Sequence, residues 1–275
     1  MSTTPTPVES LAMLMRLLKL PAFARYAEEV AQKAETEGWT FGHYLHHLAQ
    51  LEVEERRRRK IERNSKDSEL LKEKTLATLD RTRLTAKVAK MLPTLCEGGF
   101  IERGENLLVF GLPGRGKTHI VCAIGHELIS RRHRVLFTAT YALVQRLLVA
   151  KRDLRLEKEL GVLDGFDAII LDDIGYVQQN RDEMEVLFTF LAERYERRSV
   201  IITSNLVFSA WDRIFKDPMT TAAAIDRLVH HAVILEMAGP SMRAEDAQKE
   251  QHTATTTKAK KMDSGKSGNQ TDGEM

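Results

Sequence analysis

The chain has 275 residues, 43% hydrophobic and 29% charged, a composition that excludes a wholly disordered, collagen-like or coiled-coil protein. Its 41 basic and 39 acidic side chains leave a net charge of +2, so any affinity for nucleic acid must come from local clusters of basic residues. Two cysteines, Cys96 and Cys122, are too few for a disulfide framework. The first residues lack a leader pattern, and no apolar run approaches the length of a membrane span. We therefore expect a cytoplasmic protein with no membrane partner.

The N-terminal part has the pattern of a small helical unit. Apolar residues recur at helical spacing from Leu11 to about Arg63, with a polar interruption around Gly38. We expect residues 1–72 to form an all-helical domain. The pattern then weakens around Pro93 and the following pair of glycines, so residues 73–103 are expected to be a linker and a lead-in helix.

Five short apolar runs rich in β-branched residues follow, and a segment long enough for a helix separates each from the next. They read NLLVF, RVLFT, DAIIL, SVIIT and AVILE. This alternation predicts βαβ units, and so an α/β fold with a central, mainly parallel five-stranded sheet flanked by helices, over residues 104–244. Residues 245–275 contain almost no large apolar side chains and are expected to form a disordered polar tail.

The strongest motif is GLPGRGKT, which satisfies G-x-x-x-x-G-K-[ST] between a predicted strand and a predicted helix. Its glycines let backbone N–H groups curl around phosphates, and the helix presents its positive dipole end to them. Lys117 is expected to reach the β- and γ-phosphates, and the Thr118 hydroxyl to hold Mg²⁺. The residues expected to line the nucleotide are Gly111, Pro113, Gly114, Arg115, Gly116, Lys117, Thr118 and His119.

Two further polar groups come directly after predicted strands. Asp172 and Asp173 directly follow the run DAIIL, at the edge of a parallel sheet where ligands bind. Asp172 suits a ligand of Mg²⁺, and Asp173 suits a group that orients or deprotonates the attacking water. Asn205 follows the run SVIIT and is a candidate for contact with the γ-phosphate and that water. The alternatives are an ordinary strand-to-turn boundary for the aspartates and local capping for the asparagine.

Four blocks of the sequence, in this order, together resemble the IstB family, the ATP-binding transposition helpers of insertion sequences of the IS21 type. They are GENLLVFGLPGRGKTHIVCAIGHEL, DAIILDDIGY, VIITSNLVFSAWDRIF and AAIDRLVHHAVILEM. The resemblance implies an AAA+ P-loop ATPase fold, related to bacterial helicase loaders and initiator ATPases. It also implies ATP and Mg²⁺ as cofactors, with duplex DNA and a transposase encoded by a neighbouring gene as partners.

The resemblance also suggests roles for residues that their local sequence leaves open. Asn205 resembles the family's first sensor, and Arg227 resembles an arginine finger donated to the ATP of a neighbouring subunit. A homo-oligomer would then be required for hydrolysis. Arg243 resembles the second sensor, although the aromatic residue usual before it is Met242 here. The local sequence alone favours a solvent-exposed helix residue for Arg227.

The densest basic run, residues 56–60, is a candidate for contact with DNA phosphates. A salt-bridged solvent-facing surface is an equally good interpretation, because acidic residues precede the arginines by four positions. The expected pairs are Glu52 with Arg56, Glu54 with Arg58, and Glu55 with Arg59.

The histidines at 43, 46 and 47 and at 230 and 231 have no carboxylate or cysteine nearby in sequence, so we interpret them as ordinary surface or core residues. Rival functions are a replicative helicase loader, a non-catalytic switch that binds ATP, and a small-molecule kinase. The paired aspartates and the Ser-Asn after separate strands favour water over a bound acceptor, and so argue against the kinase.

Overall fold

The computed structural model describes residues 7–176, 181–206, 210–211 and 218–238. The chain divides into two compact units, one ending at Asp67 and the other beginning at Ser68. The domain limits expected at residues 72 and 103 remain predictions. The polar tail expected at 245–275, and Arg243 before it, lie outside the described residues.

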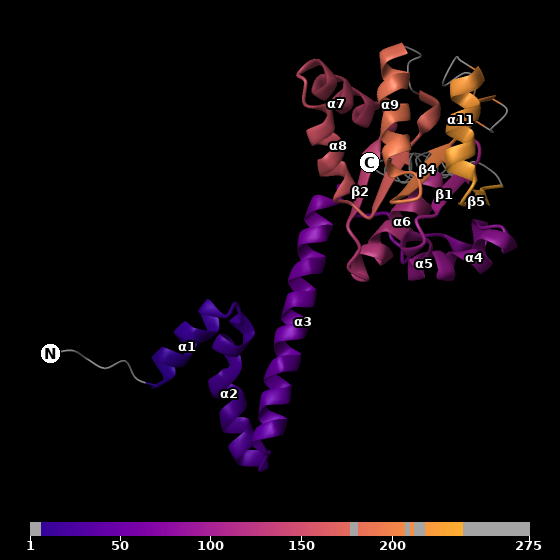
Figure 1. Ribbon diagram of the computed structural model, residues 1–275. Coiled ribbons are helices and arrows are strands. Elements are labelled where there is room, and N and C mark those ends of the chain that lie inside the picture. Colours follow the sequence, from indigo (N-terminus) through magenta and orange to yellow (C-terminus); the bar gives the residue numbers. More distant parts are fainter. Residues whose placement is uncertain (1–6, 177–180, 207–209, 212–217, 239–275) are drawn as a thin grey trace, which may run out of the picture. The chain divides into compact units, whose positions relative to one another are not determined.

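The first unit consists of three helices, α1 (Pro7–Leu17), α2 (Pro21–Glu37) and α3 (Phe41–Asp67) (Figure 1). Gly38 ends α2 in the left-handed conformation, at the interruption that the sequence predicts. Glu52 of α3 is buried and accepts a hydrogen bond from the backbone N–H of Ala22, in the first turn of α2, at 2.8 Å. This carboxylate satisfies a helix N-terminus and so joins α3 to α2.

The second unit is built on a five-stranded sheet in which every neighbouring pair is parallel, with the order β2-β3-β4-β1-β5. The strands are β1 (Asn106–Phe110), β2 (Val135–Ala139), β3 (Ala168–Asp172), β4 (Ser199–Ser204) and β5 (Ala232–Glu236). All five coincide with the apolar runs of the sequence, which confirms the predicted α/β fold. The central strands β1, β3 and β4 are almost wholly buried, as parallel strands covered on both faces are.

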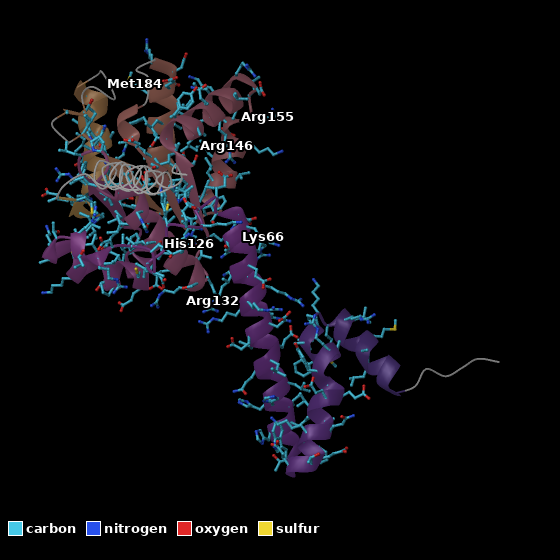
Figure 2. The ribbon with its side chains drawn as sticks, turned by 180° about the vertical axis from the view of Figure 1, so that it is seen from behind. Lys66, His126, Arg132, Arg146, Arg155 and Met184 are labelled. Atoms are coloured by element: carbon cyan, nitrogen blue, oxygen red, sulfur yellow. The ribbon has the colours of Figure 1, made fainter. Side chains whose placement is uncertain are left out.

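Helices cover both faces of this sheet (Figure 1; Figure 2 gives the view from behind). One face packs against α7 (Thr140–Arg152), α8 (Leu156–Asp164), α9 (Arg181–Arg194) and α11 (Pro218–Val229), with Trp211 in the same core. The other face carries α6 (Lys117–Ser130), which packs on α4 (Ala86–Glu97). The described part of this unit also has three short helical segments, η1 (Arg81–Arg83), α5 (Gly99–Glu102) and η2 (Ile174–Tyr176).

Helix α6 is buried along most of its length, because it lies between the sheet and α4. Cys122 is fully buried in it, and this burial raises the pKa of its thiol to about 11. The Cys122 thiol is therefore packed in the core and protonated at neutral pH. Among the described residues, no helix combines the length and the apolar character needed to cross a bilayer.

A buried arginine holds the amino ends of two strands together. Arg194, at the end of α9, is 2% exposed and donates hydrogen bonds to the carbonyl oxygens of Leu163, Phe166 and Ser199, each at 3.0 Å. Burial lowers the pKa of its guanidinium to about 10, so the group stays charged at neutral pH. Several donors on one planar cation can satisfy carbonyls from different elements at once.

Replacing Arg194 by Met should therefore lower the free energy of unfolding by about 2–4 kcal/mol, because three buried carbonyls lose a charged donor. Urea denaturation measures the change. Arg152→Met is the matched control, since the Arg152 side chain is 76% exposed, and it should stay within about 0.5 kcal/mol of the unaltered chain. Equal stability of both variants would contradict this role for Arg194.

Candidate functional site

A glycine-rich loop, residues 111–116, connects β1 to α6. Gly114 and Gly116 have φ angles of 78° and 80°, in the left-handed region that glycine adopts without strain. At Gly111 a side chain would not fit, because a Cβ would lie 2.6 Å from the carbonyl oxygen of Met237. Gly116 is the N-cap of α6 and offers no side-chain cap, so the first N–H groups of the helix remain available to an anion.

Lys117 is the first residue of α6, and its side chain folds back over this loop. Its ammonium group donates hydrogen bonds to the carbonyl oxygens of Gly111 at 2.7 Å and Leu112 at 3.2 Å. The residue is only 8% exposed. A positive charge is thus held within the curl of the loop, where it adds to the field of the helix N-terminus.

The carboxylate of Asp172, at the end of β3, accepts hydrogen bonds from the hydroxyl groups of two residues on other elements. Thr118 of α6 donates to its oxygens at 3.0 and 3.1 Å, and Thr203 of β4 donates to Oδ1 at 2.7 Å. The Thr140 hydroxyl also donates to the Asp172 backbone carbonyl at 3.0 Å. The structure therefore brings the loop, β3 and β4 together at the carboxyl edge of the sheet, where α/β proteins bind ligands.

The next residue, Asp173, adopts an uncommon backbone conformation for a residue with a side chain, with a φ of 62°. Its backbone N–H donates to the Thr203 hydroxyl at 2.8 Å, which holds the turn after β3 against β4. The side-chain oxygen of Asn205 approaches Gly175 so closely that no Cβ would fit there. This oxygen is buried and has no hydrogen-bond partner within the described part of the chain. Asp173 and Asn205 thus lie in adjoining turns beside Asp172.

His119, in the first turn of α6, contacts the segment that precedes η1. Its Nε2 lies 3.2 Å from both the carbonyl oxygen of Thr75 and the hydroxyl of Thr78. The segment 75–78 is therefore fastened to the helix that begins at the loop. Pro113 and Arg115 lie within the loop itself.

Arg227 lies at the opposite edge of the sheet from these groups. It is in the last turn of α11, and the carbonyl of the next residue, Leu228, accepts a hydrogen bond from the side chain of Asn106 at 3.2 Å. Asn106 begins β1, whereas the glycine-rich loop follows the end of that strand, roughly 16 Å away at 3.3 Å per residue. The guanidinium lies over the ring of Phe188, 4.5 Å from its centre. The fold therefore separates Arg227 from the loop of its own chain.

Sequence reasoning missed Thr140 and Thr203, whose hydroxyls fix the turn around Asp172 and Asp173. The available signal was a threonine near the end of a predicted strand, but such residues are common in strands. Only the strand order makes Thr203 informative, because β4 lies directly beside β3.

The basic run on α3 is largely engaged in ion pairs. The pairs predicted for Arg56 with Glu52 and for Arg59 with Glu55 are present, at 2.8 and 2.9 Å. Arg58 pairs with Glu55 at 2.8 Å instead of with Glu54, which lies 4.0 Å from Arg57. Arg56 also donates to the carbonyl oxygen of Lys19 at 2.8 Å, so this arginine has a structural role in the helical unit.

His230 and His231 are exposed surface residues, one of the two environments predicted for the histidines. Folding brings Glu196, more than thirty positions earlier in the sequence, beside them, and His231 Nε2 lies 3.8 Å from Glu196 Oε1. The turns that precede β4 and β5 carry these residues, and both strands lie next to β1 in the sheet.

Replacing Thr203 by Val should lower the free energy of unfolding by about 1–3 kcal/mol, because the Asp173 N–H loses its acceptor and Asp172 loses a donor. Thermal or urea denaturation provides the measurement. Thr203→Ser, which keeps the hydroxyl, should retain most of the stability. A serine variant as unstable as the valine variant would show that the methyl group matters more than these hydrogen bonds.

Comparison with known proteins gives a consistent result. The model of the family of IstB-like ATP binding proteins matches residues 13–250. A protein of Sinorhizobium fredii, named as an insertion sequence ATP-binding protein, is 42% identical over 239 residues, which are 86% of this chain and 80% of the relative. A protein of Pseudomonas aeruginosa, named as an ATP-binding protein of insertion sequence IS21, is 34% identical over 88% of this chain and 91% of its own length.

Solved structures show the same fold at low sequence identity. The replication initiator DnaA from Aquifex aeolicus, bound to AMPPCP, gives a TM-score of 0.51 at 16% identity, over 66% of this chain and 56% of that one. A second structure of DnaA, bound to AMPPCP and single-stranded DNA, gives a TM-score of 0.54 at 17% identity with the same coverage. These likenesses show that this chain shares its α/β fold with the two DnaA structures.

Proposed function

Because the chain belongs to the family of IstB-like ATP-binding proteins, we propose that it binds and hydrolyses ATP with Mg²⁺, and that it assembles on duplex DNA to assist a separate transposase. The observation that carries the proposal is the hydrogen bond from Thr118 to Asp172, beside the glycine-rich loop. A hydroxyl and a carboxylate in contact form the oxygen-ligand pair that P-loop enzymes use for Mg²⁺.

The loop and the start of α6 would bind the triphosphate. Backbone N–H groups of residues 114–118 would surround the β-phosphate, and the ammonium of Lys117 would exchange its two loop carbonyls for phosphate oxygens. Thr118 and Asp172 would hold Mg²⁺, whose positive charge would offset that of the phosphates. The Thr203 hydroxyl keeps Asp172 in the orientation that this requires.

Asp173 and Asn205 would act on the attacking water. Asp173 would accept a proton from that water or orient it, and the buried amide of Asn205 would position the water against the γ-phosphate. The buried Asn205 oxygen, which has no partner among the described residues, supports this role, because such an oxygen gains a hydrogen bond when water or ligand arrives.

Hydrolysis would need a second copy of the chain. Arg227 lies at the opposite edge of the sheet from its own loop, so it could complete only the site of a neighbouring subunit. A guanidinium donated in this way stabilises charge on the transferring phosphoryl group. Arg243, outside the described residues, would be a second sensor of the nucleotide.

The proposed partners are duplex DNA and a transposase. Both relatives are named for insertion sequences, which are mobile DNA elements. On α3, the side chain of Arg57 is 51% exposed, and Lys60 is also exposed, so these residues can meet DNA phosphates while Arg56 keeps its structural contacts. Two buried free thiols fit a reducing cytoplasm.

Lys117→Ala should abolish measurable binding of Mg²⁺·ATP, because the loop loses its one ammonium group at the phosphates. Isothermal titration calorimetry with a slowly hydrolysed ATP analogue measures the affinity. Lys158 is an exposed residue of α8, so Lys158→Ala is the control and should bind the analogue as tightly as the unaltered chain does. Unchanged affinity after Lys117→Ala would overturn the nucleotide site.

Arg227→Ala should bind ATP normally but lose about 10³-fold or more in turnover, measured as phosphate release in the presence of duplex DNA. A mixture of Arg227→Ala with Lys117→Ala should regain activity, because the Lys117 variant can still donate Arg227 to intact ATP sites. Arg152→Ala serves as the control for loss of an exposed arginine. Failure of the mixture to exceed its separate components would contradict donation between subunits.

A further inference from the structure

A second group of ligating side chains lies at the amino edge of the sheet. The group consists of Glu196, His230 and His231, whose ligand atoms all lie within 4.8 Å of one another. The imidazole rings of the two histidines are 4.2 Å apart between centres, at 60° to each other. All three side chains are exposed to solvent.

The backbone around this group is fixed by the start of β1. The backbone N–H of Asn106 donates to the His231 carbonyl oxygen at 2.7 Å, which holds the turn between α11 and β5. Gly104 lies against the Glu196 carbonyl, since a Cβ there would be 3.3 Å from that oxygen. The ligating residues therefore come from two turns whose backbones both contact the segment that leads into β1. These contacts fix the backbone positions from which the three side chains extend.

The chemistry of this set matches a transition-metal ion better than a hard cation. Two imidazoles and one carboxylate are the ligands of many three-residue Zn²⁺ sites, in which water completes the coordination. The hydroxyl of Tyr195 lies 3.2 Å from His230 Nδ1. When Nδ1 donates its proton to that hydroxyl, Nε2 keeps a lone pair for a metal, as in sites where an outer partner orients the ligand.

Only small side-chain movements are needed to close the group around an ion. Tetrahedral bonds of about 2.1 Å place ligand atoms roughly 3.4 Å apart, and the atoms here lie within 4.8 Å. Exposed side chains can make up this difference by rotation. An ion pair alone explains why Glu196 and His231 lie 3.8 Å apart. It does not explain why the His230 side chain lies beside both of them.

We propose that Glu196, His230 and His231 bind a divalent transition-metal ion of the Zn²⁺ type. This site is separate from the Asp172 site, because one lies before β1 and the other at the carboxyl end of the same sheet. Its ion would join the turn before β4 to the turn before β5. It would thereby restrain the end of α11, because His230 directly follows the last residue of that helix and lies three residues after Arg227. An effect on turnover through Arg227 rests on the proposed function.

The test is a calorimetric titration of the full chain with Zn²⁺ in the absence of nucleotide. The melting temperature of the chain is also measured with and without Zn²⁺. The unaltered chain should bind Zn²⁺ and melt at a higher temperature when Zn²⁺ is present. Glu196→Gln and His231→Ala should each weaken binding by at least about tenfold and remove the thermal shift. Both replaced side chains are more than half exposed, so the variants should fold normally, and circular dichroism checks this.

The matched control is the double variant His43→Ala, His47→Ala, which removes two histidines one helical turn apart on α3. Because Trp39 stacks on His43 at 4.1 Å between ring centres, its fluorescence reports any Zn²⁺ bound there. Retained affinity in this control, with loss in the other two variants, supports the proposal. Three results would overturn the proposal. They are no Zn²⁺ binding by the unaltered chain, unchanged affinity in the Glu196 and His231 variants, or loss of affinity in the control.

Discussion

The Asp172 carboxylate is the group on which the arrangement of the site depends. It accepts hydroxyl donors from α6 and from β4, and its own strand, β3, lies beside β4 in parallel register. Parallel strands bring their carboxyl ends to one edge, so residues far apart in the sequence meet there. This partly buried carboxylate connects the glycine-rich loop to two strands, so loss of its partners disturbs all three elements together.

The same sheet also explains why one chain forms an incomplete site. Groups that follow β1, β3 and β4 gather at the carboxyl edge, whereas Arg227 precedes β5 and lies near the first residue of β1. Five residues of strand separate the two edges, and no side chain spans that length. Assembly of several copies is the arrangement by which the proposed hydrolysis would bring an arginine to the phosphates.

The fold and the loop could be predicted from sequence because their signals are local. Each strand is a continuous apolar run, and the loop motif lies between one such run and an amphipathic helix. Thr203 and Glu196 could not be found in the same way. Thr203 meets Asp172 across 31 positions, and its importance follows from the strand order. Glu196 reaches the histidine pair only because β4 and β5 both lie next to β1.

The most direct test of this account is a crystal structure with Mn²⁺ in place of Mg²⁺ and a slowly hydrolysed ATP analogue. Anomalous scattering locates Mn²⁺ without reference to the protein. We expect one nucleotide-associated peak between the Thr118 hydroxyl and the Asp172 carboxylate, with the triphosphate enclosed by residues 111–118. A nucleotide bound elsewhere, or a manganese ion remote from Asp172, would contradict the account.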